Sequence, residues 1–237
     1  MTVRFERLAG LAAFGILAIT VWAEPAAAAA CGGTIAPPVV SVRTDARPAT
    51  QDHSRGIANL SGDPRLAVPH GLRDFRYAVG VTAAEADGKS KWEMRGEALP
   101  DGRQCWWITQ LQIVITVSTK VFIAKEVPRG SCLWNEVVKH EAKHVRTDQK
   151  LFPQMAGLIR PKVLRAVSHS IATKSQAEAR TVLGNLINKA TAAAVADFQK
   201  TRNAMQLKID TREEYSRPNR VCGEAEVTAA IQRAGLL

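Results

Sequence analysis

Aromatic residues are scarce in this chain. They make up 5% of its 237 residues, and only two of them are tyrosines. Surfaces that bind nucleic acid combine basic residues with aromatic ones, and outside Trp106-Trp107 this chain has little such interleaving. The net charge of +10 comes from Lys and Arg residues spread along the sequence. We therefore expect no nucleic-acid module, and we expect a diffusely basic, solvated surface.

Apolar runs long enough to cross a bilayer are also lacking. The run from Leu8 to Trp22 has 15 residues, whereas a span needs about 20. It follows a basic start with Arg4 and Arg7 and precedes a small-residue tract at 26–30. This arrangement is typical of a secretory signal peptide over residues 1–30. We expect a secreted or periplasmic protein with no stable membrane span.

Cysteines are few and never form a CxxC pair, which argues against a zinc site built from thiolates. The four are Cys31, Cys105, Cys132 and Cys222. An even number in an exported chain is compatible with two disulfides. Two β-rich segments flank Ser118-Thr119, and a hairpin turning there would set Cys105 opposite Cys132; these segments are residues 106–117 and 120–127. The remaining two cysteines would pair by elimination.

The composition changes along the chain. Residues 31–72 are rich in Pro, Gly, Ser and Asp, which predicts a flexible leader. Residues 73–237 are expected to form a single domain. Its first part contains strand patterns at Asp74–Ala83 and Lys91–Ala98, before the hairpin described above.

From Leu133 onward the pattern is helical. Helices are expected over 133–151, over 154–173 with a kink or restart at Pro161, and over 175–207. Strands that precede helices predict the α+β class, here a small antiparallel sheet followed by a helical half.

The most specific motif is His140-Glu141-Ala142-Lys143-His144, which reads HExxH. Two histidines four residues apart stand on the same face of a helix, where both imidazoles can reach one Zn²⁺. Glu141 then lies beside the metal and can act as the general base toward a water molecule. Ser131 can cap this helix, and Pro153 is expected to end it.

A catalytic zinc site requires a third protein ligand. The acid-rich segment 210–215 offers Asp210 or Glu213 for this role, and the Tyr215 hydroxyl could stabilise an oxyanion. The alternative is an ordinary turn whose acids pair with neighbouring arginines. Asp148 has two interpretations as well: it either orients the His144 ring through a hydrogen bond, or it is an exposed acid in an ion pair.

The order of these features resembles a family of small secreted bacterial domains of unknown function that are predicted to be zincin-like zinc proteases. The resemblance covers residues 73–222 and rests on the Tyr77 strand, Cys105, a hairpin, Trp134 and HEAKHV at 140–145. It implies a sheet lying before the active-site helix. It also implies zinc on His140 and His144, with Glu141 as the base.

Two features depart from that family. Its later motif has an Asp followed five residues on by His-Gly, where this chain has Asp210 and then Tyr215-Ser216. The family also often has Gly in place of Lys143. The third ligand is therefore left open by the resemblance.

Two functional hypotheses follow. The first is an exported, monomeric zinc metallopeptidase that binds an extended peptide substrate along an edge strand, expected at Lys120–Val127. The second is a non-catalytic envelope protein whose basic surface binds an anionic polymer.

Overall fold

The computed structural model describes residues 3–4, 35–62 and 76–237. Of the described residues, 49% are helical and 28% lie in strands, in agreement with the predicted α+β class. The expected signal peptide, apart from residues 3–4, lies outside the described residues, as does Cys31. Within the described part of the chain, no helix is both long and apolar enough to cross a membrane.

The sheet is mixed, so the prediction of an antiparallel sheet was wrong. Two long strands, β4 (Gly80–Ala98) and β5 (Gln104–Ile123), pair antiparallel. The strands β2 (Val39–Ala46) and β3 (Thr50–Asp52) run parallel to β5. Two short strands pair antiparallel at the margins: β1 (Val3–Arg4) with β4, and β6 (Ile171–Thr173) with β5.

The hairpin turns at Leu99–Arg103, and the predicted turn at Ser118-Thr119 does not exist. Gly102 has a φ of 82°, which a residue with a side chain rarely adopts. Pro, Asp and Gly in this segment make it a stronger turn than Ser-Thr. The predicted strands Asp74–Ala83 and Lys91–Ala98 overlap the two ends of β4.

Part of the expected flexible leader belongs to the folded structure. It forms β2, β3 and the short helix α1 (Ile57–Gly62), and the side chains of Val40, Ile57 and Leu60 are buried. The described prolines of this region, Pro37, Pro38 and Pro48, lie outside the two strands and the helix. Proline content there marks the connections between elements.

The motif lies on a 36-residue helix, α2 (Cys132–Val167). Ser131 caps it by accepting a hydrogen bond from the Trp134 N–H at 3.1 Å, as predicted. The prediction that the helix stops before Pro153 was wrong, because α2 continues through both Pro153 and Pro161. Both prolines are exposed, so water can hydrate the carbonyls that they leave without an intrahelical partner.

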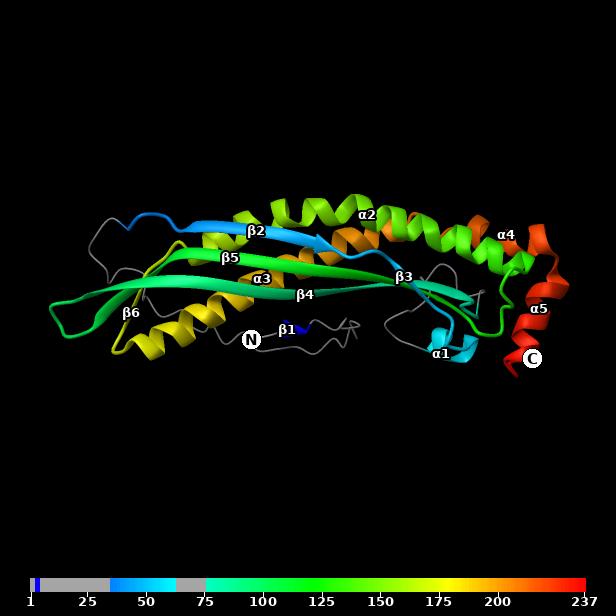
Figure 1. The fold of residues 1–237 in the computed structure, drawn as a ribbon, viewed down its shortest axis with the longest axis horizontal. Helices are drawn as coiled ribbons and strands as arrows, with labels where there is room; N and C mark the ends of the chain where they lie inside the picture. The colour runs from blue at the N-terminus through cyan, green and yellow to red at the C-terminus, as the bar shows by residue number, and fades with distance from the viewer. Residues whose placement is uncertain (1–2, 5–34, 63–75) are drawn as a thin grey trace, which may run out of the picture.

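Three further helices follow. The long helix α3 (Gln176–Gln206), capped by Ser175, agrees with the predicted helix over 175–207. The helices α4 (Arg212–Cys222) and α5 (Glu224–Arg233) form the C-terminal part of the chain. Figure 1 shows α2 running along the sheet, with α4 and α5 gathered at the end where α2 begins.

Two hydrophobic clusters hold the layers together. The larger one joins one face of β5, including Leu111, Ile113 and Ile115, to the buried sides of α2 and α3. The smaller one packs the first turns of α2, through Leu133 and Val137, against the end of β5 and against α1 and α5. The HExxH segment therefore lies where rigid elements from both ends of the sequence meet.

Candidate metal centre

Helix α2 brings the two motif histidines together. Their Nε2 atoms are 3.1 Å apart, and the ring centroids are separated by 4.8 Å. This proximity follows from the helical repeat, because residues i and i+4 lie on one face.

The structure brings Asp210 to the same point. Asp210 lies between α3 and α4, and its Oδ1 is 3.3 Å from His140 Nε2 and 3.1 Å from His144 Nε2. Ligands bound tetrahedrally at about 2.0 to 2.1 Å would be about 3.3 to 3.4 Å apart. The triangle of donor atoms therefore has the size that one zinc ion requires, and its two imidazoles and one carboxylate are a donor set used by catalytic zinc sites.

The other ring nitrogen of each histidine faces an oxygen atom. His144 Nδ1 is 2.6 Å from Gln206 Oε1, and His140 Nδ1 is 3.4 Å from Glu214 Oε2. An N–H at each Nδ1 can donate to these oxygens, and in the neutral imidazole this leaves a lone pair on each Nε2. Three lone pairs then converge, and a cation is the natural partner for them.

The electrostatics of the centre also favour positive charge. Burial alone would raise the pKa of Asp210, but hydrogen bonds from His140 and His144 and their charge outweigh it and hold that pKa at about 2. Burial alone would lower the pKa of His144, yet the hydrogen bond with Asp210 and the nearby Glu141 charge raise it. The site therefore has a negative potential that a bound cation would neutralise.

Glu141 lies in the same cavity, which has a volume of about 460 Å³. Its side chain is only 3% exposed, and its Oε2 accepts a hydrogen bond from Thr82 Oγ1 at 2.7 Å. Burial raises the pKa of Glu141 above its usual range. A carboxylate with a raised pKa is a more effective proton acceptor near neutral pH.

Gly80 provides the space for Glu141. A Cβ atom at this position would lie 2.8 Å from Glu141 Oε1 and would clash with a Val137 methyl carbon. We expect Gly80→Ala to destabilise the fold by about 1 to 3 kcal/mol through overpacking and to displace the Glu141 carboxylate. Urea unfolding measures the cost. Gly88→Ala on the same strand is the control, because no heavy atom lies within 4 Å of a Cβ there; equal effects of the two changes would contradict the prediction.

The remaining predicted site residues have different positions. Tyr215 lies beside the centre, with its ring centroid 5.8 Å from that of His140 and a hydrogen bond to Asp210. Burial raises the pKa of its hydroxyl, which keeps Tyr215 protonated as a hydrogen-bond donor. Glu213 is exposed and does not belong to the group of candidate ligands formed by His140, His144 and Asp210.

Asp148 matches neither of its two predicted roles. It is 1% exposed, so it is not a surface acid. It accepts two hydrogen bonds from Arg202 at 2.6 and 2.8 Å, and a third from Gln206 Nε2 at 2.6 Å. Its connection to His144 therefore runs through Gln206.

Sequence reasoning did not identify Gln206 or Thr82, and it included Glu214 only as part of the acid-rich segment 210–215. The sequence contains a signal for Glu214 alone: Thr211-x-x-Glu214 is the spacing of a capping box, and the Thr211 hydroxyl does accept the Glu214 N–H at 3.2 Å. That pattern places the start of a helix directly after Asp210. Lys143 donates to Glu214 at 2.6 Å.

The expected substrate edge was also misplaced. Lys120–Val127 does not form an edge, since β5 is paired there with β4 on one side and β3 on the other. Among the described residues, the start of β4 pairs with β5 alone and forms the edge next to the cavity. The Val79 carbonyl accepts a hydrogen bond from Ala124 N–H, so the backbone groups of Gly80 and Thr82 point away from β5.

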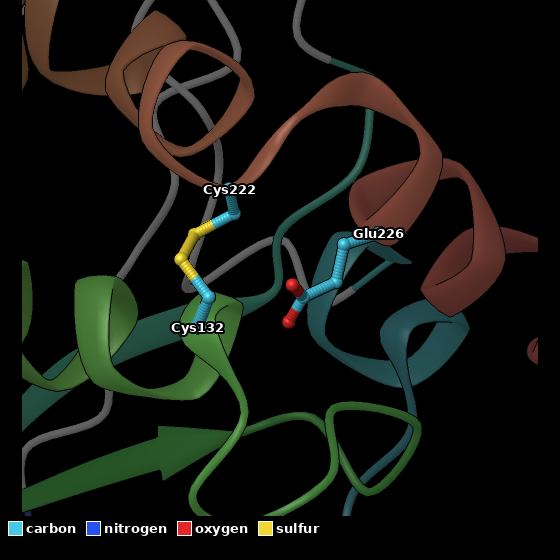
Figure 2. Close-up of side chains that lie close together, drawn as sticks. All are labelled: Cys132, Cys222 and Glu226. Carbon is cyan, nitrogen blue, oxygen red and sulfur yellow. A yellow bond between two sulfur atoms is a disulfide. The ribbon is translucent and has the colours of Figure 1, made fainter.

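A disulfide connects the two helices that carry the centre. Cys132, at the start of α2, is bonded to Cys222, at the end of α4 (Figure 2). The predicted pairing of Cys105 with Cys132, and of Cys31 with Cys222, was therefore wrong. Cys105 lies at the start of β5 and Cys132 beyond its end, and a strand of 20 residues spans roughly 65 Å. Cys105 is disulfide-bonded as well.

Glu226 supports the same junction. Its Oε1 accepts a hydrogen bond from the Leu133 N–H at 2.8 Å, in the first turn of α2. Figure 2 shows its carboxylate next to the disulfide. Although Cys132, Cys222 and Glu226 are close enough to surround an ion, the sulfur atoms are bonded to each other and are not thiolate ligands.

We expect loss of this disulfide to weaken the fold. The bond closes a loop with a sequence separation of 90 residues, and removing a native disulfide costs about 2 to 5 kcal/mol. Urea unfolding of a Cys132→Ala, Cys222→Ala double variant measures the change. A loss below about 1 kcal/mol would mean that other contacts suffice to hold α4 on α2.

Comparison with known proteins finds no matching family model, no similar curated protein and no similar solved structure. The case for a function therefore rests on the geometry of the centre.

Proposed function

We propose that this protein is an exported zinc-dependent metallopeptidase. The observation that carries the proposal is the triangle of Nε2 atoms of His140 and His144 with Oδ1 of Asp210, whose sides are 3.1 to 3.3 Å. These three residues would hold the ion. The family resemblance of the HEAKHV segment is consistent with this assignment.

A zinc ion at this point would lower the pKa of a water molecule and polarise a substrate carbonyl. Glu141 accepts the proton of the attacking water and later delivers it to the leaving amine. Thr82 holds the Glu141 carboxylate in place through its 2.7 Å hydrogen bond. The Tyr215 hydroxyl lies beside the centre, where it hydrogen-bonds Asp210, and it can donate to the oxyanion that forms by exchanging that partner.

The start of β4 supports a peptide as the substrate. Residues 76–82 line the cavity together with the motif residues. The outward N–H and C=O groups of Gly80 and Thr82 can pair with an extended chain, which would add a strand beside Glu141. A peptide bond held there lies next to the proposed base.

Metal analysis and cleavage assays on the purified mature protein test the proposal. We expect close to one zinc per chain, and cleavage of a mixed peptide library detected by mass spectrometry. A chelator should abolish cleavage, and added Zn²⁺ should restore it. Absence of both zinc and cleavage would overturn the proposal and favour the non-catalytic envelope protein.

A further inference from the structure

We infer that Gln206 is a positioning residue that holds His144 in the tautomer needed to bind zinc, and that the buried Asp148–Arg202 ion pair fixes Gln206 in turn. This inference rests on the proposed function for the role of the zinc ion. The arrangement of the three buried side chains can also be tested without any metal.

The direction of the Gln206 amide is determined by its neighbours. Its nitrogen lies 2.6 Å from Asp148 Oδ1 and 3.3 Å from the backbone carbonyl of His144. Both of these oxygens are acceptors, so the amide nitrogen must face them as a donor. The amide oxygen is then left facing His144 Nδ1 at 2.6 Å.

This contact determines where the His144 proton lies. An amide oxygen can only accept, so Nδ1 must carry the hydrogen and donate it. Nε2 is then the ring atom that faces His140 Nε2 and Asp210 Oδ1, and it offers its lone pair to an ion once the proton that it shares with Asp210 has left. His144 is therefore oriented as a ligand before any ion arrives.

Asp148 is itself held on several sides. Arg202 donates to both of its oxygens, and each of these two side chains is 1% exposed. The opposite charges cancel, so the pair adds no net charge beneath the centre. Because Gln206 is the last residue of α3 and His144 lies on α2, the connection also locks the two helices together at the site.

His140 is held less firmly. Its Nδ1 lies 3.4 Å from Glu214 Oε2, and this oxygen also accepts a hydrogen bond from Lys143 Nζ at 2.6 Å. The His140 side chain is 19% exposed, compared with 9% for His144. We therefore expect a single fixed tautomer at His144 and a mixture at His140 in the metal-free protein.

The first experiment uses the metal-free protein. Nitrogen-15 NMR of the histidine rings should show His144 with its proton on Nδ1. The variant Gln206→Met, which has a similar shape but no acceptor, should show a mixture of tautomers. A wild-type His144 protonated on Nε2 alone would overturn the inference.

The second experiment measures zinc affinity by competition with a chromophoric chelator. We expect Gln206→Met to weaken binding 10- to 100-fold, the range for partners of metal-ligating histidines. Gln199→Met, on the same helix and also partly buried, is the matched control and should change affinity less than threefold. Equal affinities of the two variants would contradict the assignment.

A charge exchange separates positioning from a general loss of stability. Gln206→Glu alone puts a second carboxylate against Asp148, so zinc binding should weaken. Adding Asp148→Asn removes the repulsion between the two carboxylates and leaves the carboxylate at position 206 to balance the Arg202 charge, so the double variant should bind at least tenfold more tightly than Gln206→Glu. A double variant that binds zinc no more tightly than the single one would argue against the connection.

The failure of the proposed function and the failure of this inference can be told apart. If the wild-type protein binds no zinc, the peptidase proposal fails, while the His144 tautomer measured by NMR still decides this inference.

Discussion

Replacing Glu141 with glutamine is expected to abolish peptide cleavage while zinc remains bound. The amide keeps the shape of the carboxylate and can still accept the Thr82 hydrogen bond, but it cannot take a proton from water. Loss of a general base lowers the rate about 10²- to 10⁴-fold. Measurements of kcat/KM and of zinc content on the same preparation test both parts of the prediction.

The matched control is Glu136→Gln, one turn earlier on α2. Glu136 is also buried, but its two oxygens pair with Lys139 and Arg217. We expect the Glu136 variant to retain cleavage within a few-fold. Wild-type cleavage by the Glu141 variant would show that another group acts as the base.

The second large effect is expected at the third ligand. Asp210→Asn keeps the side-chain shape but removes the negative charge that faces both Nε2 atoms. Changes to residues that only contact a ligand already cost about 10- to 100-fold in metal affinity. We therefore expect the loss from a ligand itself to be greater, with zinc occupancy falling from near one per chain to near zero and cleavage being lost with it.

Glu213→Gln provides the control, because it removes the same charge three residues away on an exposed side chain. Its zinc affinity should stay within threefold of wild type in a chelator competition. The reverse result, with zinc lost from the Glu213 variant and kept by the Asp210 variant, would make Glu213 the ligand and overturn the geometry described above.

The elements predicted correctly are those specified by nearby residues. The Ser131 cap, the course of α3 and the proximity of His140 to His144 all depend on contacts within one or a few helical turns. Hydrogen bonds over three or four residues form wherever the helix forms. Such features can be read from the sequence because their partners are adjacent in it.

Several wrong predictions came from local sequence rules, such as proline ending a helix, whose effect is outweighed by tertiary packing. Pro153 and Pro161 lie inside α2, since the opposite face of the helix is buried along its length, through residues such as Met155, Ile159 and Val163. The polar pair Ser118-Thr119 continues β5 because both residues pair with β4, and the Thr119 hydroxyl lies 3.4 Å from the Asp148 carboxylate. Neither contact is visible in a short stretch of sequence.

The sequence by itself therefore determined the α+β composition and the motif histidines with their neighbouring glutamate. Only the tertiary structure placed Asp210, and not Glu213, beside the two histidines, joined Cys132 to Cys222, and brought Thr82 to Glu141 and Gln206 to His144. These partners are 59 to 90 residues apart in the chain. Contacts over such distances depend on how the sheet and helices pack, so no periodicity or spacing in the sequence specifies them.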